Sequence, residues 1–144
     1  MRLPADEARR RFASAPVARL ATLGSQGEPH IIPVTFALDG EHIYSAVDAK
    51  PKTTSRLRRL ANIAADPRVA VLADHYSDDW DRLWWVRADG RAAILGTRDE
   101  MAGPLRLLAD RYPQYRVNPP QGPVIAVLAV RWAGWAASEP GQNP

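Results

Sequence analysis

The feature that most constrains the fold of this chain is a series of short apolar runs, rich in β-branched residues and separated by turn residues. Runs of this kind, bounded by glycine, proline or aspartate, are typical of β-strands. They occupy residues 17–23, about 30–38, 41–47, 69–73, 82–95 and 124–136. Most follow one another through short turns rather than in regular alternation with helices. We therefore expect a mainly β, α+β fold, with an antiparallel sheet closed into a barrel and helices on its periphery.

The clearest turn in the sequence is Asp39-Gly40, a dipeptide typical of two-residue hairpin turns. With this dipeptide as the turn, the numbers of facing residues add up to about 79. The register pairs Val34 with Ser45 and Ile32 with Val47, and places Lys50 close to Pro29. A similar dipeptide, Asp89-Gly90, lies inside the run 82–95, where the sequence allows either a hairpin turn or a β-bulge.

Helices are predicted over residues 4–14, 53–65 and 97–112. The middle one carries apolar residues on one face at a spacing of 3.6, and the last begins with a capping box formed by Thr97 and Glu100. Pro104 either lies within this last helix or divides it. We expect a single domain over residues 1–137, and a disordered tail over 138–144, which is polar and rich in proline and glycine.

The composition excludes several classes of protein. The chain has no cysteine, which rules out disulfides, thiol nucleophiles, iron–sulfur clusters and thiolate zinc sites. The three histidines are not at metal-ligand spacing with a carboxylate, so no metal site is expected. No apolar run spans a bilayer, and the acidic first residues do not fit a signal peptide, which indicates a cytoplasmic protein without membrane contact. A net charge of +3 is too small to indicate nucleic-acid binding by itself.

The most informative segment is the basic stretch between Asp48 and Asp66, which holds five cations and no acidic residue. Lys50, Lys52 and Thr53 stand at the predicted start of a helix, where unpaired amides and the helix dipole attract anions. The segment therefore predicts a phosphate site. An ordinary solvated basic face explains it equally well. Nucleic acid is a weaker candidate, because the cations are not interleaved with aromatic residues and no recognition helix is evident.

A cluster of aromatic residues follows, with Tyr76, Trp80, Trp84 and Trp85 close together in the sequence. Neighbouring residues of a strand point to opposite faces, so one of Trp84 and Trp85 enters the barrel. The other then covers a subunit interface or a planar ligand. Arg87 shares the face of Trp85 and places a cation beside the same surface. For either tryptophan alone, core packing or a dimer contact is the simpler interpretation.

The runs at 17–23 and 27–34 resemble the opening of the pyridoxamine 5′-phosphate oxidase-like split barrels. Five further segments are similar to the actinobacterial branch of that family that uses the deazaflavin coenzyme F420. They are Lys50-Pro51-Lys52, Leu60-Ala61-Asn62-Ile63, Asp66-Pro67-Arg68-Val69, Asp79-Trp80 and Leu83-Trp84-Trp85-Val86-Arg87. The resemblance covers about residues 8–135. It implies a six-stranded antiparallel split barrel of the FMN-binding type, and a homodimer with the cofactor in a groove at the interface.

The resemblance also implies which residues bind the cofactor. It places the phosphate at the start of the helix after the third strand, the ring against the second strand, and further contacts on a facing strand of the partner subunit. The expected cofactor-binding residues are Ile32, Pro33, Val34, Ser45, Val47, Lys50, Lys52, Thr53, Arg56, Trp85 and Arg87. The arginine-rich helix would suit the polyanionic glutamate tail of the deazaflavin coenzyme.

The function that the resemblance implies is an oxidoreductase in which reduced coenzyme F420 transfers hydride to a small, electron-poor organic substrate. One alternative is an FMN-dependent oxidase or reductase, and another is an F420 carrier that binds without turnover. The chain shows no motif for a protein nucleophile. The proton that accompanies hydride transfer would come from solvent, from His75 or from Tyr76.

Overall fold

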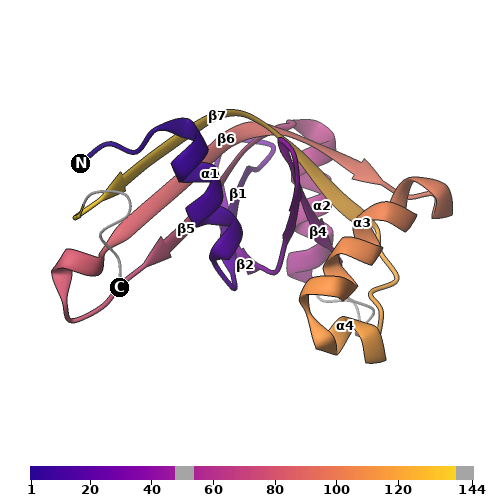
Figure 1. Ribbon diagram of the computed structural model, residues 1–144. Helices are drawn as coiled ribbons and strands as arrows, with labels where there is room; N and C mark the ends of the chain where they lie inside the picture. Colours follow the sequence, from indigo (N-terminus) through magenta and orange to yellow (C-terminus); the bar gives the residue numbers. More distant parts are fainter. Residues whose placement is uncertain (48–53, 139–144) are drawn as a thin grey trace.

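Figure 1 shows the computed structural model, which describes residues 1–47 and 54–138. These residues form five helical segments and seven strands. The helical segments are α1 (Ala5–Ser14), α2 (Thr54–Ala65), the short 3₁₀ turn η1 (Trp80–Arg82), α3 (Arg98–Arg111) and α4 (Pro113–Val117). The strands are β1 (Ala18–Leu23), β2 (Pro29–Val34), β3 (Ala37–Asp39), β4 (His42–Ala46), β5 (Arg68–His75), β6 (Trp84–Leu95) and β7 (Val124–Ala136).

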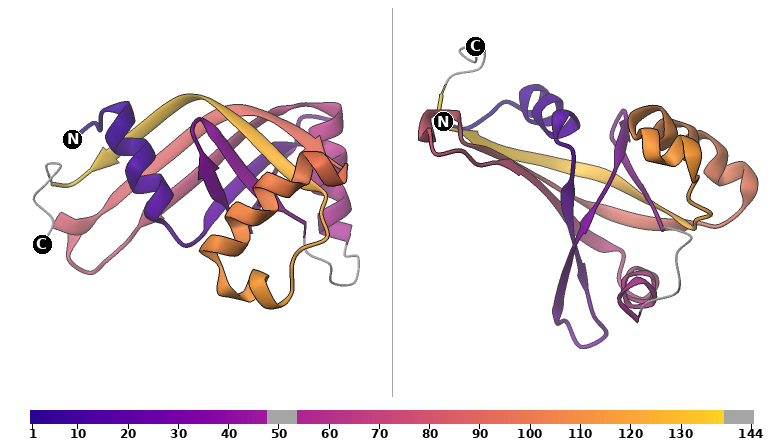
Figure 2. Two further views of the ribbon diagram at one scale, coloured as in Figure 1. Left: turned by 45° about the vertical axis from the view of Figure 1, so that its right-hand side comes forward. Right: turned by 90° about the horizontal axis from the view of Figure 1, so that it is seen from below.

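The strands form one antiparallel sheet with the order β2-β1-β5-β6-β7-β4-β3. The two end strands of this order, β2 and β3, follow one another in the chain and are separated only by Thr35 and Phe36. The chain thus joins the two edges of the sheet, although β2 and β3 do not pair. Figure 2 (right) shows the β1–β2 hairpin and α2 on one side of β6 and β7, with α1 and α3 on the other. The expected mainly β, α+β fold with an antiparallel sheet is confirmed.

The sheet has seven strands and not the six expected, because the strand predicted over residues 30–38 is divided at Thr35 and Phe36. At this break, side chains replace a neighbouring strand as hydrogen-bond partners. The Phe36 amide donates to the Tyr112 hydroxyl at 3.1 Å, and the Phe36 carbonyl accepts from the Arg111 guanidinium at 3.0 Å. Phe36 itself is fully buried. A β-branched pattern cannot reveal a break whose backbone partners come from a distant helix.

The predicted register of the hairpin is also wrong. Ala37 faces Tyr44 and Asp39 faces His42, so the numbers of facing residues add up to 81. The two turn residues are Gly40, at φ +60°, and Glu41, because glycine takes the left-handed conformation at the first loop position. The remaining predicted pairs fail because β2 pairs with β1 and β4 pairs with β7. Val34 faces Ala18, Ile32 faces Leu20 and Ser45 faces Ile125, while Val47 lies past the end of β4 and Lys50 lies outside the described residues.

Asp89-Gly90 marks a β-bulge and not a hairpin turn. Asp89 faces Arg131 and Gly90 faces Ala129, which leaves Val130 of β7 without a facing residue. A Cβ atom on Gly90 would lie 2.3 Å from the carbonyl oxygen of Leu128, so only glycine fits at this close approach. Because successive residues alternate between faces, the one extra residue exchanges the two faces for the rest of β7.

The core lies between the sheet and α1. Phe12 of α1 is fully buried and contacts Phe36 and Trp132, with ring centroids 4.8 and 5.3 Å away. The predicted capping box of α3 is present at Thr97 and Glu100, and α3 continues past Pro104 without division. No helix within the described residues is long and apolar enough to cross a membrane. Apart from Ser138, the tail predicted to be disordered lies outside the described residues.

Candidate functional site

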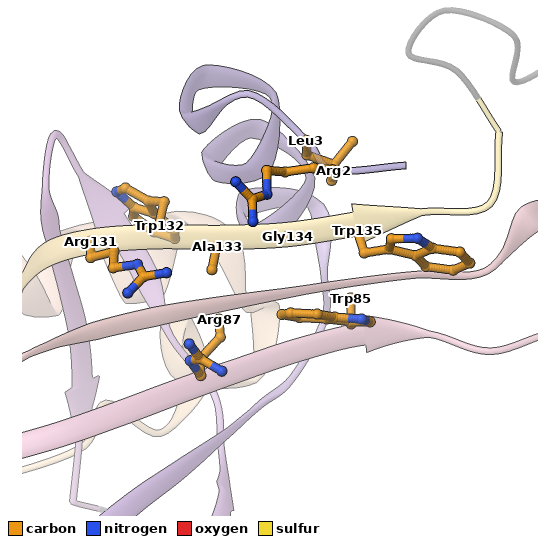
Figure 3. A pocket seen from close by; sticks show the side chains of 9 residues that line it. All are labelled: Arg2, Leu3, Trp85, Arg87, Arg131, Trp132, Ala133, Gly134 and Trp135. Carbon is orange, nitrogen blue, oxygen red and sulfur yellow. The ribbon is translucent and has the colours of Figure 1, made fainter.

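A hollow of about 500 Å³ opens on the sheet where β6 begins and β7 ends, beside the N-terminal segment (Figure 3). We call it the β6–β7 hollow. Nine residues from three segments line it: Arg2, Leu3, Trp85, Arg87, Arg131, Trp132, Ala133, Gly134 and Trp135. A volume of this size is ordinary for a small-molecule site.

The strand register explains why the hollow forms at this place. Ala133 of β7 faces Arg87 of β6, and the large side chain of Trp135 stands next to it on the same face of β7. Trp135 in turn faces Trp85 and forms a bridge with Arg2 of the N-terminal segment. The small side chain of Ala133 is therefore the floor, and indole and guanidinium groups are the walls (Figure 3).

The β-bulge places these side chains on the open face. Ile125, Val127 and Ala129 point into the core before the bulge, whereas Ala136 is in the core after it. Without the bulge, regular alternation through Val130 would turn the odd-numbered residues from 131 to 135 toward the core. Residues 131–135 were not predicted as site residues. The sequence does show that residues 131, 133 and 135 share one face of the strand. Whether this face is the core face or the open face depends on the bulge.

The hollow carries an excess of positive charge. Arg87 donates to Asp89 on its own strand, with 2.7 Å between Nε and Oδ1. Arg2 and Arg131 have no ion pair with any of the described residues. The nearby Asp74, which faces Trp85, is engaged by Arg19 at 3.3 Å. Two guanidinium groups therefore remain available to an anionic ligand.

The structure confirms two expectations about this region. Trp84 packs against the core while Trp85 is 37% exposed, so the adjacent tryptophans do point to opposite faces. Trp85 and Arg87 both line the hollow and thus share a face. Trp80 is largely exposed on the 3₁₀ turn and does not reach the hollow.

The predicted residues of β2 are divided between the two faces of the sheet. Pro33 is exposed and lies in one row with Arg19, Leu72, Arg87 and Ala133, which are successive facing residues on five strands. Pro33 and the hollow thus share the outer face, about 20 Å apart at the usual strand spacing. In contrast, Ile32 packs against the core and Val34 is buried in it.

The remaining predicted cofactor residues are either buried or outside the described part. Ser45 and Val47 are both buried. Lys50, Lys52 and Thr53 lie outside the described residues, and so does the side chain of Arg56 on α2. Of the predicted cofactor residues, the structure therefore brings Trp85 and Arg87 together at the hollow. Pro33 lies on the same face of the sheet but not at the hollow.

The expectation that the basic helix is a solvated face holds only for part of α2. Arg58 is half exposed and lies 3.9 Å from Glu28. Arg59, however, is only 8% exposed and faces the protein. It lies three residues before Asn62, whose buried amide donates to the Thr22 hydroxyl at 3.0 Å. Arg59 is thus not part of a surface that could hold an anionic tail.

The two residues considered for proton transfer do not join the hollow. His75 faces Trp84, with ring centroids 6.4 Å apart, and this pair lines a separate recess of about 240 Å³ with Arg82 and residues 14–16. Tyr76 is 71% exposed in the segment after β5. Among residues 1–47 and 54–138, no three histidine, aspartate or glutamate side chains gather in a way that would hold a metal ion.

Comparison with known families assigns the fold. The model of the pyridoxamine 5′-phosphate oxidase family matches residues 4–136, nearly the whole chain. The chain belongs to this family. It is also 39% identical over 56 residues to a 5a,11a-dehydrotetracycline/5a,11a-dehydrooxytetracycline reductase of Streptomyces rimosus. That match spans 39% of this chain and 38% of the reductase.

Solved structures of the same fold cover almost the whole chain. An FAD-binding protein of Mesorhizobium loti has a TM-score of 0.71 at 21% identity, over 93% of this chain and 95% of that protein. A conserved protein of Mycobacterium tuberculosis has a TM-score of 0.73 at 22% identity, over 99% of this chain and 92% of its own. At these identities the similarity shows the fold alone.

Proposed function

We propose that this protein is an oxidoreductase that uses a flavin-type cofactor, preferably the deazaflavin coenzyme F420, to reduce a small, electron-poor organic molecule. The observation that carries the proposal is the β6–β7 hollow, in which two indoles and two unpaired guanidinium groups surround a small floor on the open face of the sheet. Membership of an oxidase family, the partial match to a reductase and the fold shared with an FAD-binding protein all support it.

The hollow fits a planar, anionic ring system. Its volume of about 500 Å³ lies in the range of small-molecule pockets. Indole side chains offer apolar faces on which a ring can stack, and guanidinium groups bind anionic oxygens through paired N–H donors. A flavin or deazaflavin ring has both features. It would stack on Trp85 beside Arg87, which leaves Arg2 and Arg131 in the same hollow for the acceptor.

The proposed cofactor site needs two copies of the chain. Val47, the last described residue before the predicted phosphate-binding segment, donates its amide to the Pro123 carbonyl at 2.9 Å, next to the beginning of β7. Ala133, the floor of the hollow, lies nine residues further along β7 than Val124, which is about 30 Å of strand. A single flavin cannot span this distance. We therefore propose a homodimer in which one copy supplies Lys50, Lys52, Thr53 and Arg56, and the other supplies Trp85 and Arg87.

The outer face of the sheet suits such a dimer. Ile31 on β2 is 63% exposed, and Trp85 and Trp135 are about two-fifths exposed. Pro33 is exposed in the same row as Arg87. Contact between two copies across this face would bury these apolar side chains and place β2 of one copy near the cofactor ring.

Trp85 and Arg87 would hold the cofactor ring, and the cofactor would supply the hydride; with one proton taken up, the acceptor would be reduced by two electrons and the cofactor oxidised by two. The side chains of the hollow orient and shield the reactants. Asp89 fixes the direction of the Arg87 guanidinium, and Trp85 and Trp135 would cover one side of the bound reactants. Because His75 and Tyr76 are not at the hollow, solvent is the proposed source of the proton.

A cofactor titration tests this function. Purified protein is titrated in parallel with coenzyme F420 and FMN, following the quenching of tryptophan fluorescence. The deazaflavin is expected to bind more tightly, and Lys50→Ala or Lys52→Ala should each weaken binding by about 1–3 kcal/mol. Arg98→Ala, which removes an exposed charge at the start of α3, is the control and should leave binding unchanged.

The result separates the proposal from its alternatives. Tighter FMN binding would assign the protein to flavin chemistry, and binding of neither would contradict the proposal. Steady-state oxidation of reduced F420 with quinones or activated enones then distinguishes a reductase from a carrier, which would bind the coenzyme without turnover. Lys50 and Lys52 are the only lysines of the chain. Their protection from amine-specific labelling by bound cofactor is therefore a second readout that does not depend on activity.

A further inference from the structure

We propose that the acceptor is an anionic aromatic molecule whose charged group is bound by Arg131 and Arg2, with its ring over Ala133 beside the indoles of Trp85 and Trp135. This inference rests on the proposed function, because it assigns the substrate class of the same site. The hollow would thus select its acceptor by charge and by flatness. A neutral acceptor of the same shape would bind more weakly.

The charges around the hollow indicate that its ligand is an anion. Arg87 is held by Asp89 at 2.7 Å, and Asp74 at the edge of this surface is held by Arg19. Both carboxylates are thereby committed to other arginines, as is Glu41, which pairs with Arg9 and accepts from Trp132 of the lining. Arg2 and Arg131, from two different segments, have no acidic partner among the described residues, and both are exposed. An anion between them would replace water and leave no buried charge unpaired.

The shape of the hollow indicates that its ligand is a flat ring. Along β7, Ala133 stands between Arg131 and Trp135, and it faces Arg87 on β6. The methyl group leaves a gap where each neighbour has a long or wide side chain (Figure 3). Trp85 and Trp135 are facing residues, so both indoles border the same end of the gap. A flat ring fits over Ala133 against these indoles, whereas an extended polymer does not fit in about 500 Å³.

The test uses a rigid aromatic acid and its neutral analogue. Naphthalene-2-carboxylate and 2-naphthalenemethanol are titrated by calorimetry into the full chain without cofactor, at one low salt concentration. The acid is expected to bind at least tenfold more tightly than the alcohol. Arg131→Gln should remove most of this preference and leave the affinity for the alcohol unchanged. Ala133→Leu keeps every charge but fills the floor, and should weaken both ligands more than tenfold.

Arg91→Gln is the matched control. Arg91 is exposed on β6 and faces Leu128, on the far side of the bulge from the hollow. Its removal changes the net charge by the same amount and should leave the preference for the acid intact. If Arg91→Gln and Arg131→Gln lost the preference for the acid to the same extent, the inference would be overturned, because the preference would then reflect the overall charge. Equal affinity for acid and alcohol in the unaltered chain would overturn it as well.

A competition experiment separates this inference from the proposed function. With saturating F420 present, naphthalene-2-carboxylate should still bind. Displacement of the acid by the cofactor would assign the arginines to the cofactor and overturn the acceptor class, while the proposed function would stand. A third outcome is that no cofactor binds, while the acid binds and Arg131→Gln loses the preference for the acid over the alcohol. The selectivity of the hollow would then stand, and the proposed redox function would fail.

Discussion

The two halves of β7 differ in what covers them. From Val124 to Val127 every residue is buried, and this half lies between β4 and β6 with α3 packed nearby (Figure 1). From Arg131 to Ala136 only Gly134 and Ala136 are buried, and the exposed Arg131 and Trp135 border the β6–β7 hollow. The bulge at Val130 separates the halves.

This difference shows how one strand can serve stability and function at once. The covered half contributes its side chains to packing on both faces, so any change of volume there is costly. The open half keeps one face in the core through Gly134 and Ala136, which leaves the other face free to carry arginine and tryptophan. Substitutions in the two halves should therefore affect different properties, stability in the covered half and binding in the open half.

The largest effect is expected in the covered half. Ile125 is 1% exposed and belongs to the core, so Ile125→Ala should lower the free energy of unfolding by about 2–5 kcal/mol. Val130→Ala at the bulge is the control. Its side chain is 67% exposed, and the change should stay within about 0.5 kcal/mol. Urea denaturation of both variants measures the contrast, and equal losses would contradict the division of β7.

The next effect is expected at the junction itself. In Gly90→Ala the new methyl group would press on the Leu128 carbonyl, which is backbone and cannot turn away. We expect a loss of about 3 kcal/mol, the upper end of the usual cost of overpacking. Gly96→Ala is the control, since a Cβ there meets nothing within 4 Å. Urea denaturation compares the two variants, and a stable Gly90→Ala protein would show that the bulge does not need this close approach.

A smaller loss of stability is expected at the break between β2 and β3, where residues at the end of α3 bond to the Phe36 backbone. Tyr112→Phe removes the hydroxyl that accepts from the buried Phe36 amide and donates to the Pro16 carbonyl. Leaving such an amide without a partner costs about 1–3 kcal/mol. Tyr115→Phe, which loses one contact with the Thr35 hydroxyl at 2.7 Å, should cost about 1 kcal/mol. Thermal unfolding ranks the two variants, and the opposite order would contradict this account of the break.

The smallest effect concerns an exposed arginine that, unlike Arg131, has an acidic partner. A side-chain hydrogen bond from Arg68, helped by the Arg68 amide, lowers the pKa of Asp66 from 3.8 to about 2. A lowered pKa means that the carboxylate stabilises the fold above pH 3.8 and loses this contribution as the pH falls through about 2. NMR titration of the Asp66 carboxyl carbon should find a midpoint near 2, and Arg68→Gln should return it toward 3.8. An unchanged midpoint in this variant would exclude Arg68 as the cause.

The prediction from sequence succeeded where the signals are local. The pattern of short runs placed the strands, the Thr97–Glu100 box placed the start of α3, and the adjacency of Trp84 and Trp85 gave them opposite faces. Each of these follows from residues within a few positions of one another. The register of the hairpin failed because a two-residue turn can begin at Asp39 or at Gly40, and both choices satisfy the same alternation.

The sequence by itself determined the mainly β fold, the antiparallel pairing and the family, since strand periodicity and turn chemistry depend on residues that are close together in the sequence. Tertiary structure decided the rest. The break at Phe36 depends on Tyr112 and Arg111, more than 70 residues away, and the facing of Arg131, Ala133 and Trp135 depends on a bulge that forms only when β6 and β7 pair. The hollow also needs Arg2, brought from the other end of the chain by its bridge to Trp135. Long-range pairing of this kind is a property of packing, and no local pattern encodes it.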